Sequence, residues 1–287
     1  MSHFLITVDV EDWFQVENLR SHYPCNTWNQ QELRVERNTR QLLELFDSLS
    51  TQNDTLIKAT FFILGWIAER CPALVKEIHK HGHEVASHGY HHTLCREEDS
   101  NSLRQDLSDS KKLLEDLISA PVTGYRAPGF SIDSDILTLI HETGYRYDSS
   151  YNSFGFNPRY GKVDFSSYPN RSGVIDLEDD FSEIPVSNLF LAGKTIPFAG
   201  GGYFRFYPFS LFKQGVAKIL RQTGTYVFYL HPWELDPDQP RVTGLPFLSR
   251  FRHYLNLDKT LTRLRSLIKA FPEASFITCN QLLTHNS

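Results

Sequence analysis

Short apolar runs and amphipathic stretches alternate along this chain. Residues 4–9 read F-L-I-T-V-D, a compact apolar run that is typical of a buried strand. Residues 38–49 then repeat leucine and phenylalanine at helical spacing, so the two segments together predict one strand–helix unit. The same alternation predicts a strand at 58–65, a helix that ends near Lys80, a strand at 83–88 and a helix over 103–118.

The helix over 103–118 carries an apolar face, and Ser102 with Gln105 fits a capping box at its start. Shorter apolar runs follow and predict strands at 123–127, 145–148, 182–186, 226–231 and 275–279. Strands that alternate with helices favour parallel pairing, and seven or more of them favour a barrel or a large open sheet. We therefore expect an α/β fold, with the barrel preferred.

Two regions depart from the alternating pattern. Residues 151–205 are rich in Gly, Pro, Ser, Asn and aromatic residues, which predicts long loops that decorate one end of the barrel. The pattern over residues 236–287 predicts a C-terminal extension that contains helix and strand. With 287 residues, the chain is long enough for one large α/β domain that spans 1–287.

Composition and charge narrow the class of protein. The chain is 40% hydrophobic and 22% charged, which is typical of a globular protein and not of a disordered one. The net charge of −5 and the lack of a basic run argue against nucleic acid as a partner. No apolar run approaches the roughly 18 residues of a membrane span, and the N-terminus does not resemble a signal peptide, so a cytoplasmic protein is expected.

The cysteines give no sign of a disulfide framework or a structural zinc site. There are 4 of them, and none is spaced as C-x-x-C. We expect reduced thiols, most of them buried.

The segment S-H-G-Y-H-H, residues 87–92, follows the predicted strand at 83–88. On a helical turn, His88 and His92 would present both imidazoles to one point, as a metal site with two histidine ligands requires. A lone histidine is usually an ordinary surface or core residue, but two at this spacing directly after a strand are less common. His91 would point elsewhere.

Three acids stand at the end of the first predicted strand, in T-V-D-V-E-D. They could mark a solvated turn, but the C-terminal ends of parallel strands meet at one edge of a β/α fold. One carboxylate with two imidazoles makes an open site for Zn²⁺ or a related divalent ion that carries out hydrolysis. Strand alternation places Glu11 on the side of Asp9 and turns Val10 away, so Glu11 is the preferred carboxylate ligand. Asp12 is the alternative if the chain turns at Val10.

Other predicted strand ends carry polar residues of the kinds that catalysis uses. They are Arg126 in G-Y-R-A-P-G-F, Asp148 in Y-R-Y-D-S-S, and His231 in F-Y-L-H-P-W-E. Each alone is most simply a capping or surface residue. At successive strand ends, however, they predict a catalytic rim.

These motifs, in this order, resemble those of the NodB-homology polysaccharide deacetylases of carbohydrate esterase family four. T-V-D-V-E-D stands where that family has paired acids, H-G-Y-H-H where it has its histidine motif, and R-A-P-G where it has its arginine–proline motif. D-S-S-Y and L-H-P fill the last two motifs, and the resemblance covers about residues 4–235. D-V-E-D-W-F, G-G-G-Y-F-R and Y-L-H-P-W-E further resemble the subgroup found at bacterial exopolysaccharide loci.

The resemblance implies a distorted, incomplete (β/α) barrel and metal-dependent removal of acetyl from an N-acetylated sugar. Zn²⁺ is the expected ion, with Co²⁺, Ni²⁺ and Mn²⁺ as alternatives. It implies these roles: Asp9 as general base, Arg126 as the residue that orients Asp9, His88 and His92 as metal ligands, His231 as general acid, and Asp148 as the partner of His231. A backbone N–H near Gly129 would stabilise the oxyanion.

The chain departs from the family at three positions. Val10 and Glu11 stand between the two aspartates that are usually adjacent, and Gly89 replaces the usual Ser or Thr. Tyr151 replaces the tryptophan of the fourth motif, and Trp233 could complete the wall beside the acetyl group.

Three functions are consistent with the sequence. The first is a deacetylase of an N-acetylated glycan in exopolysaccharide synthesis. The second is a metal-dependent amidohydrolase of a small non-sugar amide, similar to allantoinase. An extra arginine clamp in the site would favour this function. The third is a carbohydrate-binding relative without activity, which the full set of motif residues disfavours.

Overall fold

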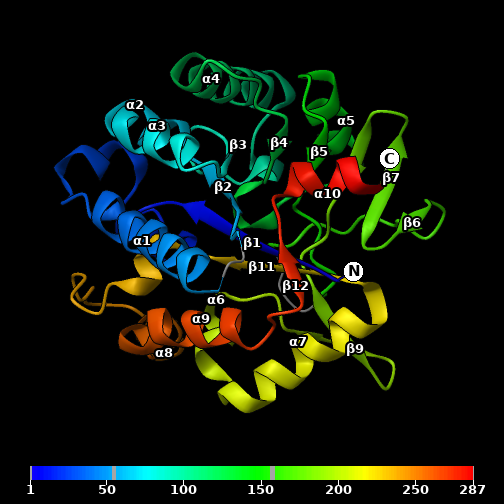
Figure 1. Ribbon diagram of the computed structural model, residues 1–287. Helices are drawn as coiled ribbons and strands as arrows, with labels where there is room; N and C mark the ends of the chain where they lie inside the picture. Colours follow the sequence, from blue (N-terminus) through cyan, green and yellow to red (C-terminus); the bar gives the residue numbers. More distant parts are fainter. Residues whose placement is uncertain (1, 54–55, 156–158, 287) are drawn as a thin grey trace.

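One large sheet forms the centre of the protein, and helices pack around it (Figure 1). The computed structural model describes residues 2–53, 56–155 and 159–286. Seven neighbouring strands in the described chain are parallel, so the expected parallel pairing is present. In spatial order they are β11 (Thr225–Leu230), β1 (Ser2–Val10), β2 (Ala59–Ile63), β3 (Glu84–Ser87), β4 (Gly124–Tyr125), β5 (Tyr147–Asp148) and β8 (Phe181–Glu183).

The sheet is mixed and open. Beyond β8 it continues in antiparallel fashion through β7 (Val174–Glu178) to β6 (Asn170–Arg171). Strand β12 (Ala274–Phe276) pairs with the start of β1. Among the described residues no strand ladder joins β6 to β11, so the expected barrel is not confirmed.

The helices follow the strands in the alternating order that the sequence pattern indicates. Most of them pack on the outer side of the sheet, and α10 lies across one end of it (Figure 1). Their bounds are α1 Val35–Asn53, α2 Gly65–Arg70, α3 Pro72–Lys80, α4 Ser100–Ile118, α5 Ser134–Glu142, α6 Gly201–Phe206, α7 Phe209–Thr223, α8 Phe247–Tyr254, α9 Thr260–Lys269 and α10 Cys279–Asn286.

Strand β1 is buried on both faces, and its two faces have different surroundings. Phe4, Ile6, Val8 and Val10 are fully buried in the larger apolar core that the helices share. The alternate positions face the opposite side, where Leu5 joins a smaller apolar cluster. Because the side chains of a strand alternate between its two faces, the polar residues at the alternate positions point toward a single pocket at the C-terminal end of β1.

Three local expectations are corrected by the structure. The helix expected to run to Lys80 is two helices, because Pro72 cannot continue the first one and instead begins the second. Helix α4 begins at Ser100 and is capped by Asp99, which accepts hydrogen bonds from the backbone N–H groups of Asn101 and Ser102. The predicted capping box at Ser102 is therefore wrong, since an aspartate three residues earlier takes the cap.

The segment 151–205 is more ordered than the predicted long loops. It holds β6, β7, β8 and the start of α6, and also a separate hairpin of β9 (Asn188–Leu191) and β10 (Lys194–Pro197). The hairpin turns at Ala192 and Gly193, whose φ angles are 50° and 75°, as a two-residue turn between twisted strands requires. These short, partly exposed strands lack the apolar runs by which strands are recognised.

The four cysteines are free thiols, and Cys71, Cys95 and Cys279 are buried, as expected from the sequence. In the described ranges, no helix combines the length and the apolarity that a bilayer crossing needs.

Candidate active site

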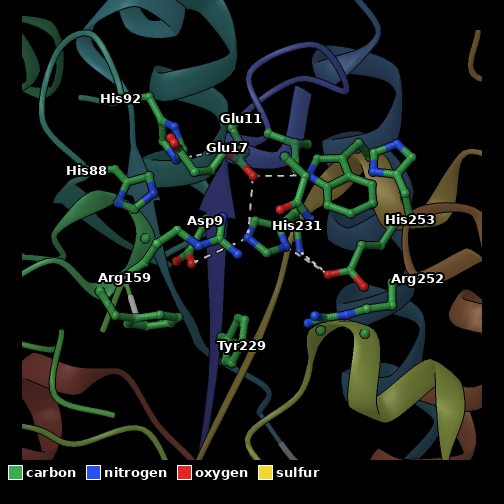
Figure 2. Close-up of a pocket in the computed structure, with 18 of the residues that line it drawn as sticks. Asp9, Glu11, Glu17, His88, His92, Arg159, Tyr229, His231, Arg252 and His253 are labelled. Atoms are coloured by element: carbon green, nitrogen blue, oxygen red, sulfur yellow. Dashed lines mark hydrogen bonds and ion pairs between the residues drawn. The ribbon is translucent and has the colours of Figure 1, made fainter. Parts of the chain in front are cut away.

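Strand ends bring the motif residues together at one pocket. Asp9 from β1, His88 after β3 and His231 after β11 all line it, and Figure 2 shows these side chains pointing toward one another. Each of these residues stands at or just beyond the C-terminal end of a parallel strand. The convergence predicted from the strand ends is therefore present in the fold.

Glu11, His88 and His92 form a compact cluster of ligand-type side chains. One ligand atom from each lies within 4.8 Å of the others, and all three residues are buried. Glu11 Oε2 lies 2.8 Å from His92 Nε2 but is buried without a hydrogen bond of normal geometry. Two imidazoles and a carboxylate that converge in this way fit a divalent ion such as Zn²⁺.

The protonation states also fit a metal site. His88 Nδ1 lies 2.7 Å from the carbonyl oxygen of Arg126, an arrangement that directs the other ring nitrogen toward the cluster. Burial lowers the pKa of His88 to about 4, so its imidazole is neutral at pH 7. Although burial alone would raise the pKa of Glu11, the neighbouring His92 and His231 hold it well below its usual range. The neutral His88 imidazole and the ionised Glu11 carboxylate are thus in the forms that bind a cation.

The two histidines do not lie on a helical turn, contrary to the sequence prediction. A loop brings them together, and Gly89 and His92 in it have φ angles of 73° and 54°. The Asp106 carboxylate holds this loop by accepting hydrogen bonds from the backbone N–H groups of Tyr90 at 2.8 Å and His91 at 3.3 Å. A Cβ at Gly89 would lie 2.8 Å from Asp106 Oδ1, so this position favours glycine over Ser or Thr.

Asp12 points away from the cluster. Its carboxylate accepts hydrogen bonds from the backbone N–H groups of Trp13 at 2.8 Å, Arg34 at 2.6 Å and Val35 at 2.9 Å. Val35 is the first residue of α1, so Asp12 caps that helix and anchors the chain after β1. The structure therefore places Glu11, and not Asp12, with His88 and His92.

Asp9 is held by Arg126, as the sequence prediction had it. Arg126 Nη1 donates to Asp9 Oδ1 at 2.8 Å and to Thr7 Oγ1 at 2.7 Å. Nε and Nη2 of Arg126 donate to the carbonyl oxygen and the hydroxyl of Ser149. The guanidinium is fully buried and fixes the orientation of the Asp9 carboxylate at the pocket.

His231 is paired with Glu234 and not with Asp148. His231 Nδ1 lies 2.8 Å from Glu234 Oε1, while Arg205 Nε donates to Glu234 Oε2 at 2.6 Å. The other ring nitrogen, Nε2, lies 3.4 Å from Glu11 Oε1 and 3.8 Å from Asp9 Oδ2. Burial would lower the pKa of His231, but the carboxylates of Glu11 and Glu234 outweigh it and raise the pKa to about 9.

Sequence reasoning missed Glu234 and Arg205. The signal for Glu234 was present in H-P-W-E. Pro232 begins a short 3₁₀ helix, and the side chain of Glu234, the third residue of that helix, accepts a hydrogen bond from the backbone N–H of His231. Arg205 lies in α6, 29 positions before Glu234 and without a local motif, so only the folded structure links the two residues.

Asp148 instead belongs to a buried pair of carboxyl groups. It lies opposite Glu183 in the β5–β8 pairing and accepts a hydrogen bond from the Ser150 hydroxyl at 2.7 Å. Ser150 in turn accepts from the backbone N–H of Ala127 at 2.7 Å. Asp148 thus positions the R-A-P-G loop, and the predicted pairing of Asp148 with His231 is wrong.

The three predicted substrate contacts have different outcomes. Gly129 lines the pocket and has a φ of 61°. Trp233 also lines it, stacks on the His231 ring at 5.3 Å and donates from Nε1 to Glu11 Oε1 at 3.1 Å. Tyr151 packs against Phe165 and is not among the described residues that line the pocket, so its predicted place beside the acetyl group is wrong.

Sequence comparison finds similarity to two family models. Residues 27–147 match the family model described as "Polysaccharide deacetylase". Residues 149–284 match a second model, described as a domain of unknown function, DUF3473. The polysaccharide deacetylase match contains the histidine and arginine motifs, whereas His231 and Glu234 lie in the second match, and Asp9 and Glu11 precede both.

Two curated proteins that match part of this chain are named as peptidoglycan deacetylases. A peptidoglycan-N-acetylglucosamine deacetylase of Bacillus cereus is 32% identical over 108 residues, which are 38% of this chain and 47% of the relative. A peptidoglycan deacetylase of Helicobacter pylori is 31% identical over 147 residues, which are 46% of this chain and 48% of the relative. This chain therefore spans about half the length of each.

Solved structures share the fold at low identity. A chain from Mycobacterium smegmatis assigned as a polysaccharide deacetylase aligns with a TM-score of 0.62 and 19% identity, covering 99% of this chain and 89% of that one. A family-four pseudoenzyme from Bacillus anthracis aligns with a TM-score of 0.52 and 12% identity, covering 99% of this chain and 66% of that one. The shared fold thus includes an inactive member, and function has to be argued from the site residues.

The two neighbouring acids are expected to respond differently to substitution. Glu11→Ala should abolish binding of a divalent ion while the protein stays folded, because it removes the carboxylate that faces His88 and His92. Asp12→Ala should keep the ion but lower the free energy of unfolding by about 1–3 kcal/mol, because three backbone N–H groups lose their acceptor. Metal analysis of the purified variants, together with denaturant unfolding, measures both effects. Loss of the ion only in Asp12→Ala would reverse the assignment.

The buried carboxyl pair predicts a pH dependence of stability. Burial and the neighbouring Asp148 raise the pKa of Glu183 well above its ordinary value, so the folded protein holds a proton there that the unfolded chain releases near pH 4.5. The pair is therefore fully stabilising below that pH, and its contribution falls as pH rises toward the folded pKa. Glu183→Gln should reduce this loss of the free energy of unfolding by about 1 kcal/mol or more between pH 5 and 8, measured by urea unfolding. An unchanged dependence of stability on pH would contradict the protonation of Glu183 in the folded protein.

Proposed function

We propose that this protein is a metal-dependent deacetylase that hydrolyses the N-acetyl groups of an amino-sugar polysaccharide. One observation carries the proposal: a single pocket is lined by Asp9, which the buried Arg126 orients, by the Glu11, His88 and His92 cluster, and by the His231–Glu234 pair. A base, a cation site and an acid on one pocket are what amide hydrolysis requires. The deacetylase domain match and the peptidoglycan deacetylases among the relatives support a sugar amide as the substrate.

A divalent ion held by Glu11, His88 and His92 would supply Lewis-acid chemistry toward the amide carbonyl. Asp9 is placed to take a proton from the attacking water, because its second oxygen is not the one that Arg126 engages. Asp9 Oδ2 lies 3.8 Å from His231 Nε2, so base and acid stand side by side at the pocket. The reacting amide would bind against both of them.

His231 is suited to protonate the departing amine. Amines leave poorly unless they are protonated, and a pKa of about 9 keeps the His231 imidazole charged near neutral pH. Glu234 holds Nδ1 and so directs Nε2 toward the pocket, and Arg205 holds Glu234 from behind. This buried chain fixes the ring and stabilises its charged form.

We also propose a role in exopolysaccharide synthesis. Support comes from the D-V-E-D-W-F and Y-L-H-P-W-E segments, which resemble the subgroup of deacetylases at exopolysaccharide loci. In the structure, these two segments supply Glu11 and Glu234. Glu11 stands in the candidate metal cluster in place of a second, adjacent aspartate. Glu234 is the partner of His231 in place of an aspartate.

Acetate release tests the proposed reaction. The protein loaded with Zn²⁺ is expected to release acetate from N-acetylated oligosaccharides, and His88→Ala should lower the rate by at least about a hundredfold, since even groups that only support a metal ligand commonly contribute about ten- to hundredfold. His91→Ala is the matched control, because His91 is an exposed neighbour outside the pocket, and it should keep the activity.

Equal release by wild-type protein and His88→Ala would overturn the mechanism. Hydrolysis of small amides together with no release from any sugar would move the function to the amidohydrolase hypothesis. Glycan binding by metal-loaded protein without hydrolysis of either class would move it to the non-catalytic relative.

A further inference from the structure

His253 lines the same pocket as Asp9 and His231, and the mechanism proposed above does not use it. It lies in the last turn of α8 and is only 3% exposed. Figure 2 shows it on the opposite side of His231 from His88. Because burial removes a polar imidazole from water at a cost, its contacts indicate what the residue contributes to the site.

Hydrogen bonds fix the protonation of the His253 ring. Gln239 Nε2 donates to the backbone carbonyl oxygens of Trp233 at 2.8 Å and Asp236 at 3.0 Å, so the amide oxygen of Gln239 is left to face His253. His253 Nε2 lies 2.8 Å from this oxygen and carries the proton, because an amide oxygen can only accept. Burial lowers the pKa of His253 to about 3, so its imidazole is neutral at pH 7. Gln239 therefore ties a neutral imidazole to the short helix that carries Trp233.

The His253 ring packs flat on the indole of Trp233. The two ring centres are 4.6 Å apart, and the ring planes differ by 11°. The same indole stacks on the His231 ring, with centres 5.3 Å apart and planes that differ by 22°. Its Nε1 also donates to Glu11 Oε1 at 3.1 Å. Trp233 thus contacts both the proposed acid and a candidate metal ligand, while His253 supports it from α8.

The backbone of His253 supports the acid by a separate route. Its carbonyl oxygen accepts a hydrogen bond from Arg205 Nη1 at 3.0 Å. Arg205 Nε in turn donates to Glu234, the partner of His231. A substitution at His253 removes the side chain and keeps this carbonyl group, so it tests the contact with Trp233 alone.

We propose that His253 is a positioning residue for the general acid, His231. Its side chain holds the indole of Trp233 against the His231 ring, and Gln239 fixes that side chain. This inference rests on the proposed deacetylase function. Groups that react must be held within about 0.5 Å of their productive geometry, and a surrounding layer of packed side chains supplies that restraint. Gln239 and His253 both lie in the second family match, beyond the end of the polysaccharide deacetylase match at residue 147.

Two substitutions of His253 separate its packing from its hydrogen bond. His253→Ala removes the ring that packs on Trp233, so it should lower kcat and kcat/KM alike by about tenfold, the lower end of what supporting residues contribute at a metal site. His253→Phe keeps a flat ring but cannot donate to Gln239, so it should keep kcat within about threefold and unfold at a lower urea concentration. Acetate release from an N-acetylated oligosaccharide and urea unfolding measure these effects.

A double substitution tests whether His253 acts through Trp233. Trp233→Leu should itself lower kcat, because it removes the indole that stacks on His231. His253→Ala added to Trp233→Leu should then lower kcat no further, since the contact between the two side chains is already lost.

His83→Ala is the matched control. His83 is also buried, and its ring centre lies 5.7 Å from that of Phe46 and 5.2 Å from that of Phe61. It directly precedes β3, at the end of the sheet away from the pocket, and is not one of the described residues that line the pocket. His83→Ala should destabilise the protein and leave kcat unchanged, so it separates a loss of stability from a loss of positioning.

A readout that needs no substrate separates this inference from the proposed function. The indole N–H signal of Trp233 in a proton–nitrogen NMR spectrum, assigned with Trp233→Phe, should shift in His253→Ala and keep its position in His83→Ala. The affinity for Zn²⁺ should fall about tenfold in His253→Ala, because the indole of Trp233 also donates to Glu11.

An unchanged Trp233 signal in His253→Ala would overturn the inference, as would an unchanged kcat or a loss confined to KM. An equal loss of kcat in His83→Ala, or a full additional loss in the double variant, would overturn it too. A shifted Trp233 signal and weaker Zn²⁺ binding in His253→Ala, with no acetate release from any sugar by the wild-type protein, would refute the deacetylase and retain the support of Trp233 by His253.

Discussion

The buried ion pair between Arg126 and Asp9 is the interaction on which the rest of the site depends. A guanidinium removed from water carries a large desolvation cost unless each of its donors finds an acceptor. Here the acceptors come from two places in the sheet, namely Thr7 and Asp9 on β1 and Ser149 just after β5. The ring of Phe62 on β2 lies 4.2 Å from the guanidinium carbon and completes its surroundings. The pair therefore fixes the relative positions of the strand ends as well as the orientation of one carboxylate.

The same arrangement links the acid–base groups to the cation site. The carbonyl oxygen of Arg126 contacts His88 Nδ1, so the residue that orients Asp9 also sets the ring of a candidate metal ligand. On the other side, Glu11 contacts both His92 and His231. No member of this network can shift without moving a neighbour, so the network holds these groups at a fixed geometry.

Periodicity predicted the parts of the fold that depend on burial. The apolar runs located β1, β2, β3 and β11, and strand alternation placed Glu11 beside Asp9, because a residue's side of a strand follows directly from its position. Strands β6, β9 and β10 are short and partly exposed and were not predicted, and the geometry of the histidine loop depends on Asp106, a residue of another element. The partner of His231 was misplaced for a similar reason. Asp148 stands at a strand end, but its carboxyl group is engaged by Ser150 and Glu183, which only the pairing of β5 with β8 reveals.

The central position of β1 has a consequence for the order in which the protein is made. Strand β1 is made before the other strands of the sheet, yet one of its sheet neighbours is β11, which ends at Leu230. Synthesis of the intervening chain takes on the order of tens of seconds at ordinary rates of translation. During that time, a strand whose apolar side chains are fully buried in the folded protein has one edge uncovered. Strand β1 is thus a central strand whose pairing is completed late, since β12, which also pairs with it, is made after β11.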